Sequence, residues 1–250
     1  MRETPRFDAR TSISVTQLLE LTHDRGPVAL LTEANDQVHL RQGDMDGACG
    51  PYSLTMALIA MGLITRAEAM SAVCPDRRTL SGKFTEKLWA FDPLFSEGVD
   101  IDDLKWLADG YRNRDLQVEI SSARTKRRIA LEVAKATDEG GAAIIRIDWL
   151  GGGGHWMLAV GHQSRQLDYS EPRCLTHILC LDPGQATPRA SLWNSVLYHT
   201  DPIGQSLSRG RYSVEYWGMD GAKRLCRLTE AVILKRPEQV AELVLHLNAA

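Results

Sequence analysis

Residues 42–53 read QGDMDGACGPYS, a run of small and polar residues that leads directly into an apolar pattern. Leu54 and Leu58 are four residues apart, and this spacing places them on one face of a helix. The proline of the run is suited to the first turn of a helix, where its missing N–H is not needed. The sequence therefore predicts a helix between residues 50 and 62, with Cys49 at its start.

A cysteine at the start of a helix lies in a favourable setting for nucleophilic chemistry. A helix N-terminus carries about half a positive charge and several unpaired N–H groups. That setting favours the thiolate over the thiol, and the same N–H groups can receive an oxyanion. Gln42, seven residues upstream, can offer its side-chain amide as a second donor. Cys49 is the candidate nucleophile, and Gln42 is the candidate oxyanion-binding side chain.

A thiolate nucleophile also needs a general base and a group that orients the base. His155 opens a predicted strand directly after four glycines, residues 151–154. Asp182 ends another predicted strand, HILCLDP at 177–183, and the following proline favours an extended backbone. If these two strands are antiparallel neighbours, Asp182 comes to lie beside His155. The sequence thus offers a candidate Cys49, His155 and Asp182 triad.

Four short motifs stand in a definite order along the chain: Gln42, Cys49-Gly50-Pro51, His155-Trp156 and Asp182-Pro183. This order resembles the papain-like cysteine peptidases, and within them the C39-like (bacteriocin-processing) branch, over about residues 40–185. The resemblance implies that Gln42 and the backbone amide of Cys49 form an oxyanion hole and that Cys49 attacks the substrate. It also implies that His155 acts as base and then acid, that Asp182 orients it, and that a protein or peptide is the substrate.

The remaining pattern predicts an α+β papain-like fold, with an N-terminal helical half packed on a C-terminal antiparallel sheet. Helices are expected at 15–22, 65–73, in two pieces within 76–114, and at 124–140. Strands are expected at 27–33, 116–120, 142–150, 155–163, 177–183, 212–218 and 229–235. We predict one domain over 1–250: a mainly helical part at about 1–140, a sheet part at about 141–236, and a C-terminal helix at 237–250.

Composition excludes collagen-like, coiled-coil and largely disordered proteins. The 250 residues carry 29 Lys and Arg against 32 Asp and Glu, and 44% are hydrophobic, which is typical of a globular domain. The net charge of −3 gives no overall basic field, so we expect no nucleic-acid partner. No stretch is apolar enough for a membrane span, and no secretory signal is evident, so we expect a cytoplasmic protein. The oligomeric state stays open.

Five scattered cysteines show no zinc-site spacing, so we expect reduced thiols and neither a metal nor a cofactor. Asp44, Asp46 and Gly47 resemble part of a calcium loop, but the glutamate that such a loop needs is replaced by Thr55. We interpret the basic run 124–128 as a solvated helix face rather than a site for an acidic partner.

Alternatives remain open for the chemistry. The same triad supports a papain-like acyltransferase, a transglutaminase, a deamidase or an isopeptidase. A non-catalytic papain-like binding module is the alternative from a different class.

Overall fold

The structure is a computed structural model that describes residues 10–43, 47–71, 76–90, 98–111, 116–122, 125–166, 172–200 and 211–237. Its helices are α1 (Cys49–Ala60), α2 (Arg66–Ala69), α3 (Leu80–Trp89), α4 (Ile101–Ala108) and α5 (Lys126–Asp138). The first strands are β1 (Arg10–Val15), β2 (Leu19–Thr22), β3 (Gly26–Ala29) and β4 (Gln117–Ser121). The later strands are β5 (Ala142–Trp149), β6 (Gly154–Gln166), β7 (Cys174–Leu181), β8 (Ser195–Tyr198), β9 (Val214–Gly218) and β10 (Lys223–Lys235).

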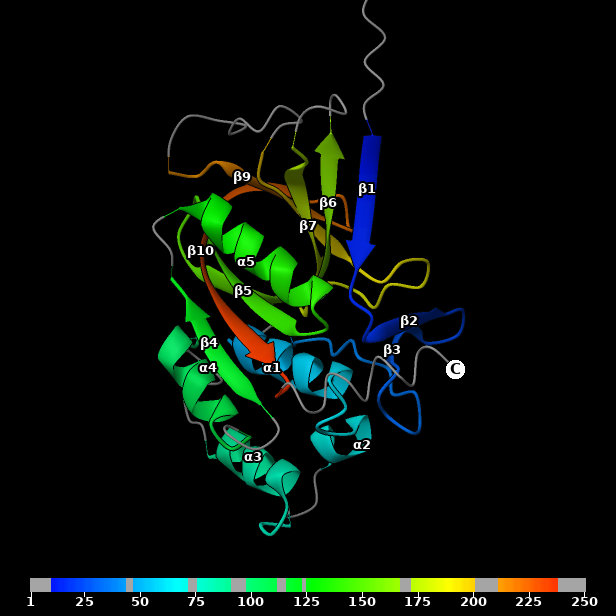
Figure 1. Cartoon of the computed structure of the whole chain (residues 1–250). Coiled ribbons are helices and arrows are strands. Elements are labelled where there is room, and N and C mark those ends of the chain that lie inside the picture. The colour runs from blue at the N-terminus through cyan, green and yellow to red at the C-terminus, as the bar shows by residue number, and fades with distance from the viewer. Residues whose placement is uncertain are drawn as a thin grey trace, which may run out of the picture.

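The six later strands, β5 to β10, form a closed antiparallel barrel (Figure 1). Neighbouring strands follow the order β6, β5, β10, β9, β8 and β7, and the pairing of β6 with β7 closes the ring. Two further strands lengthen this sheet, because β1 pairs with β6 and β4 pairs with β10. Strands β2 and β3 form a separate hairpin.

This architecture contradicts the predicted papain-like fold, in which a helical half packs on an open sheet. The sheet is closed on itself, and the described helices are short. Strand β1, from the part predicted to be helical, lies against β6. Residues 15–22, predicted as a helix, end β1 and form β2 instead. The reason is that periodicity marks individual segments, whereas closure depends on contacts between segments far apart in the chain.

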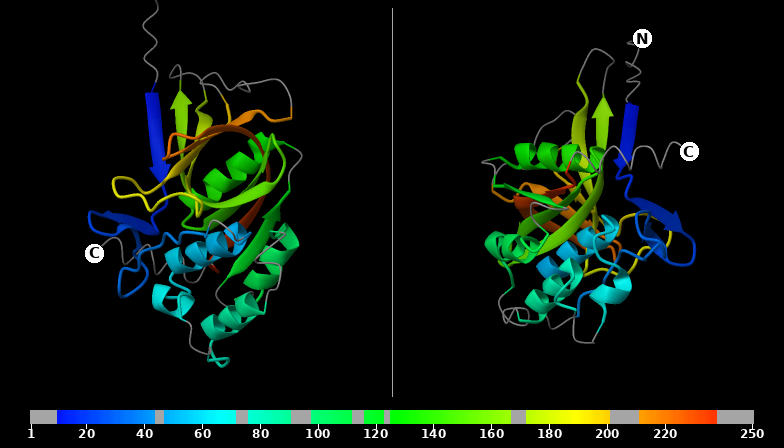
Figure 2. Two further views of the ribbon diagram at one scale, coloured as in Figure 1. Left: turned by 180° about the vertical axis from the view of Figure 1, so that it is seen from behind. Right: turned by 60° about the horizontal axis from the view of Figure 1, so that its bottom comes forward.

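Two apolar cores lie on the two faces of the barrel strands. One cluster joins all six strands of the barrel to the buried side of α5, and it includes Ile145, Met157 and Leu197. The other cluster joins α1 to the opposite face of β5, β6, β7 and β10, for example through Leu58 and Leu158. Helix α5 therefore covers the inner face, whereas α1 packs against the outside of β5 and β6 (Figure 2).

Several of the expected elements are confirmed. The helix expected at 50–62 is α1, and the helix expected at 124–140 is α5, which is followed by Gly140 in the left-handed region with a φ of 75°. The strands expected at 142–150, 155–163, 177–183, 212–218 and 229–235 correspond to β5, β6, β7, β9 and β10. The predicted C-terminal helix lies almost wholly outside the described residues.

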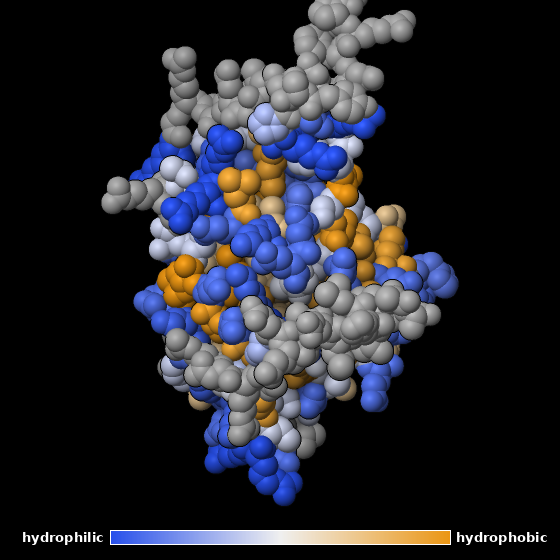
Figure 3. Space-filling model, in the orientation of Figure 1, coloured by the Kyte–Doolittle hydropathy of each residue, from blue (hydrophilic) through white to orange (hydrophobic). Residues whose placement is uncertain are grey.

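The surface in the orientation of Figure 1 is a mixture of polar and apolar side chains (Figure 3). The apolar groups on this face lie in several separate places rather than in one continuous area. In the described part of the chain, no helix combines the length and the apolar character that a membrane crossing requires.

Candidate active site

The structure brings Cys49, His155 and Asp182 together at one end of the barrel. Nε2 of His155 lies 2.7 Å from Oδ1 of Asp182, and the side chain of Cys49 lies close enough to the imidazole to raise its pKa. Because Asp182 occupies Nε2, the other ring nitrogen, Nδ1, is left for the sulfur. His155 opens β6, Asp182 directly follows β7, and Cys49 is the first residue of α1. The predicted triad is therefore assembled from three separate elements.

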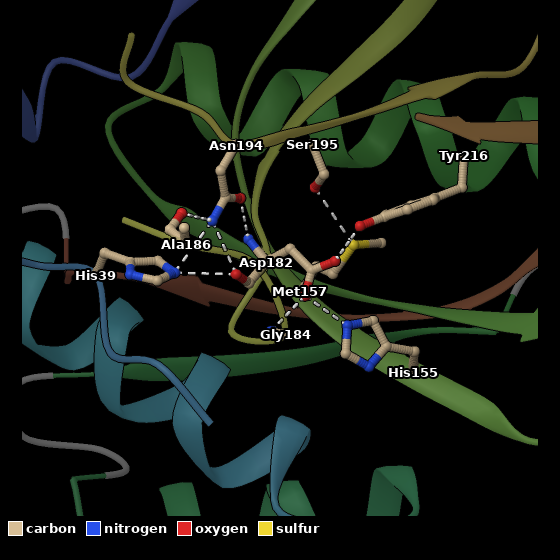
Figure 4. Close-up of polar contacts among 9 residues, drawn as sticks. All are labelled: His39, His155, Met157, Asp182, Gly184, Ala186, Asn194, Ser195 and Tyr216. Carbon is tan, nitrogen blue, oxygen red and sulfur yellow. Dashed lines mark hydrogen bonds and ion pairs between the residues drawn. The ribbon is translucent and has the colours of Figure 1, made fainter. Parts of the chain in front are cut away.

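The carboxylate of Asp182 accepts hydrogen bonds from three groups (Figure 4). Besides His155, the backbone N–H of Gly184 donates to Oδ1 over 2.7 Å. The hydroxyl of Tyr216 donates to Oδ2 over 2.6 Å. The Asp182 side chain is only 3% exposed, so these bonds replace the water that a carboxylate would otherwise bind. The carboxylate is thereby fixed in one orientation toward the imidazole.

The backbone of Asp182 is held just as firmly. Its N–H donates to Oδ1 of Asn194 over 2.6 Å, and its carbonyl accepts from Nδ2 of Asn194 over 2.9 Å. Nε2 of His39 lies 2.9 Å from the same carbonyl, so this nitrogen carries the proton and donates. Oγ1 of Thr187 then donates to Nδ1 of His39 over 2.9 Å. Burial lowers the pKa of His39, which keeps this neutral tautomer in place.

An aromatic wall supports the imidazole of His155. The ring of Trp149 stacks on it with centroids 6.1 Å apart and planes inclined by 24°. The same indole meets the ring of Tyr216 edge-on at 5.2 Å. Trp149 is the last residue of β5, and β5 pairs with β6, the strand that carries His155. The imidazole is thus confined between a carboxylate and an aromatic face, and its Nδ1 atom is left for the sulfur of Cys49.

Close packing at residue 50 sets the position of Cys49. A Cβ atom at Gly50 would lie 2.1 Å from Cγ2 of Val99 and 3.2 Å from Cδ1 of Trp156. Only glycine lets α1 begin this close to β6. Trp156 is 2% exposed and donates from Nε1 to the carbonyl of Val99 over 2.9 Å, so its indole is part of the packed core beside Gly50.

Gln42 lies beside the turn that follows β7. Its backbone N–H donates to the carbonyl of Pro183 over 2.9 Å, so this segment runs next to Asp182. Cys49 occupies the first position of α1, where the backbone N–H groups have no partner within the helix. These two placements agree with the predicted oxyanion hole, although the role of the Gln42 side chain stays a prediction. Asp44 and Asp46 lie outside the described residues.

The charges of the site support a protonated imidazole. Burial by itself would lower the pKa of His155, but the hydrogen bonds and charges of Asp182 and Cys49 outweigh it and raise the pKa to about 10. Burial would raise the pKa of Asp182, and the hydrogen bonds from His155, Tyr216 and Gly184 overcome this and lower it. At neutral pH the site therefore holds an imidazolium that is paired with the Asp182 carboxylate and lies beside the sulfur of Cys49.

The other described cysteines are placed differently. Cys180 and Cys226 are fully buried in the barrel interior. Burial raises the pKa of the Cys180 thiol, and it raises that of Cys226 to about 12. Cys174 is partly exposed, and all described cysteines are free thiols. Within the described residues, no group of three or more His, Cys, Asp or Glu side chains is placed to hold a metal ion.

Sequence reasoning missed three supporting residues: His39, Asn194 and Tyr216. His39 and Asn194 act on the backbone of Asp182, and no sequence motif announces such contacts. Tyr216 lies in a strand that was predicted, and its alternation with the outward-facing Glu215 and Trp217 could have marked it as an inward-facing polar side chain.

Comparison with known proteins adds no assignment for this arrangement. No protein-family model matches the chain, and no curated protein matches it in sequence.

Proposed function

We propose that the protein is a cysteine hydrolase that cleaves a peptide or isopeptide bond through a thioester intermediate. The observation that carries this proposal is the juxtaposition of Cys49, His155 and Asp182: His155 is hydrogen-bonded to Asp182, and the Cys49 side chain helps to raise the pKa of the imidazole. A nucleophile, a base and a group that orients the base are the minimum that this chemistry requires.

In the first half-reaction, the Cys49 thiolate attacks the carbonyl carbon of the substrate and forms a C–S bond. The resulting oxyanion lies against the N–H groups at the start of α1, with Gln42 as the proposed second donor. His155 then gives its proton to the nitrogen of the leaving amine, and the C–N bond breaks. The acyl group is left on sulfur as a thioester.

In the second half-reaction, His155 takes a proton from water as the water oxygen attacks the thioester. The C–S bond breaks, the product carboxylic acid leaves, and the thiolate–imidazolium pair is restored. Asp182 keeps the imidazole in position throughout and stabilises its charged form, which is the role its three hydrogen bonds suit.

Activity-based labelling followed by a peptide-library screen tests the proposal. A limiting amount of iodoacetamide at neutral pH should alkylate Cys49 first, and Cys49→Ala should abolish both this labelling and substrate turnover. Cys174→Ser is the matched control, because it removes a thiol that is more exposed than that of Cys49 and lies outside the site, and it should leave activity intact.

The same screen separates hydrolysis from transfer. Adding a primary amine to the library reaction should leave free carboxylates as the main product if water resolves the thioester. Exclusive amide products would instead indicate an acyltransferase. Equal labelling of Cys49 and Cys174, together with full turnover by Cys49→Ala, would overturn the proposal.

A further inference from the structure

One edge of β10 is left open in the middle of the strand. On this edge, β9 pairs with residues Lys223 to Cys226, and β4 pairs with residues Ala231 to Lys235. Residues 227–230 lie between these partners, and no described strand covers them there. A register shift at the same place, between Leu228 and Glu230 in the pairing with β5, distorts the strand further. The barrel wall therefore has a gap between β9 and β4.

A pocket of about 300 Å³ fills this gap, and we call it the β10 notch. Its lining residues are Thr125, Lys126, Arg211, Ser213, Arg227, Leu228 and Thr229. Three of them are cationic, three carry hydroxyl groups, and none is acidic. A pocket with this composition is suited to an anion.

The cations of the notch are not neutralised by neighbouring carboxylates. Arg227 makes no ion pair within the described chain, although Asp148 lies opposite it in the sheet. Asp148 and Glu230, the acidic groups that flank this stretch of strand, both pair with Arg146, at 3.4 and 3.3 Å. Both carboxylates therefore pair with Arg146 and not with the cations of the notch, which keeps its positive charge.

Lys126 is held in a fixed position at the wall of the notch. Its Nζ donates to the carbonyl oxygens of His199 and Ser213, each over 2.7 Å. Two of the three ammonium hydrogens are thereby used, and one is left. Burial lowers the pKa of Lys126, so a bound anion would offset the cost of keeping this charge partly buried. Lys126 thus differs from the solvated position that its basic run suggested.

We propose that the β10 notch binds a phosphate group, either as the free ion or as a monoester. Forked guanidinium groups, an ammonium and hydroxyl donors around one volume match the oxygens of a phosphate dianion better than a single carboxylate does. A volume of about 300 Å³ is also larger than a phosphate alone, so part of an ester could enter with it. The proposal does not depend on the proposed hydrolase activity.

Titration calorimetry on the full chain tests this site with two probes, inorganic phosphate and phosphoserine. Arg227→Gln and Arg211→Gln each remove one cation of the notch and should weaken binding of the probes by about tenfold or more. Arg127→Gln is the matched control, because it makes the same charge change at an exposed residue that does not line the notch. It should change the affinity by about twofold or less.

The two probes also distinguish the sources of the phosphate group. Tighter binding of phosphoserine than of inorganic phosphate would assign the notch to an ester, and the reverse order would assign it to the free ion. Lack of binding of both probes at millimolar concentration would overturn the proposal. An equal loss of affinity in all three variants would do so too, because it would reveal only a general charge effect.

Discussion

Asp182→Asn tests whether the charge of Asp182, rather than its shape, raises the pKa of His155. Asparagine has nearly the same shape as aspartate, and its amide oxygen can still accept from His155 and the Gly184 N–H. The new NH₂ group would then face the hydroxyl of Tyr216, which can accept a hydrogen bond as well as donate one. The substitution therefore removes the negative charge while most of the contacts stay in place.

The expected effect follows from the opposing influences on His155. Burial alone would lower the pKa of His155, and Asp182 is the main group that raises it, to about 10. Without that charge the pKa should fall toward the ordinary value of 6.5 or below. A fall from about 10 to 6.5 corresponds to a loss on the order of 5 kcal/mol of stabilisation of the imidazolium, at about 1.4 kcal/mol per pKa unit.

Two measurements check this expectation. The imidazole of His155 is titrated by NMR, and the alkylation of Cys49 by iodoacetamide is followed at pH 6. The variant should alkylate about tenfold more slowly or worse, since the thiolate loses its cationic partner. Asp138→Asn is the control, because it removes the carboxylate 3.1 Å from Nε2 of His162 and should leave Cys49 unaffected. An unchanged pKa of His155 in Asp182→Asn would refute the reasoning.

Three further predictions concern the same site. Tyr216→Phe removes one charged hydrogen bond to Asp182, worth about 1.5–3 kcal/mol, so kcat should fall about tenfold or more while KM changes little in a peptide-cleavage assay. Gly50→Ala should reduce activity with the fold retained by circular dichroism, and Val99→Ala in the same chain should restore it by relieving the 2.1 Å contact; failure of this rescue would contradict the packing argument. Because folding raises the pKa of His155 from 6.5 to about 10, its stabilising contribution is complete below about pH 6.5 and disappears by about pH 10. The free energy of unfolding, measured in urea against His155→Gln, should show a difference that shrinks over this range; a constant difference would contradict the linkage.

The candidate site could be predicted from sequence because its main residues lie at the ends of regular elements. Cys49 begins α1, His155 opens β6 and Asp182 follows β7, and the patterns of all three elements are clear. His39 and Asn194 could not be found in this way. His39 lies 143 residues from Asp182 in the chain and Asn194 lies 12, and both act through backbone contacts that exist only after the chain has folded.

The architecture was predicted less well, for two physical reasons. Val15, Leu18 and Leu19 have the three- and four-residue spacing of a helix, but the chain turns between them and forms β1 and β2. The separate strands of the barrel were largely found, whereas their order was not. Pairings such as that of Ser12 with Ser164 join segments far apart in sequence, and local patterns carry no information about them.

The sulfur and the imidazole belong to different layers of the molecule, one to a helix and the other to the barrel. Helix α1 contacts β5 and β6 mainly through packed apolar side chains, whereas β6 is hydrogen-bonded to strands on both of its edges. We expect mild denaturant to disrupt the packing between α1 and these strands first, so that activity is lost while the barrel is still folded. Helix α1, with Cys49, would then separate from His155 before the strands of the barrel unfold.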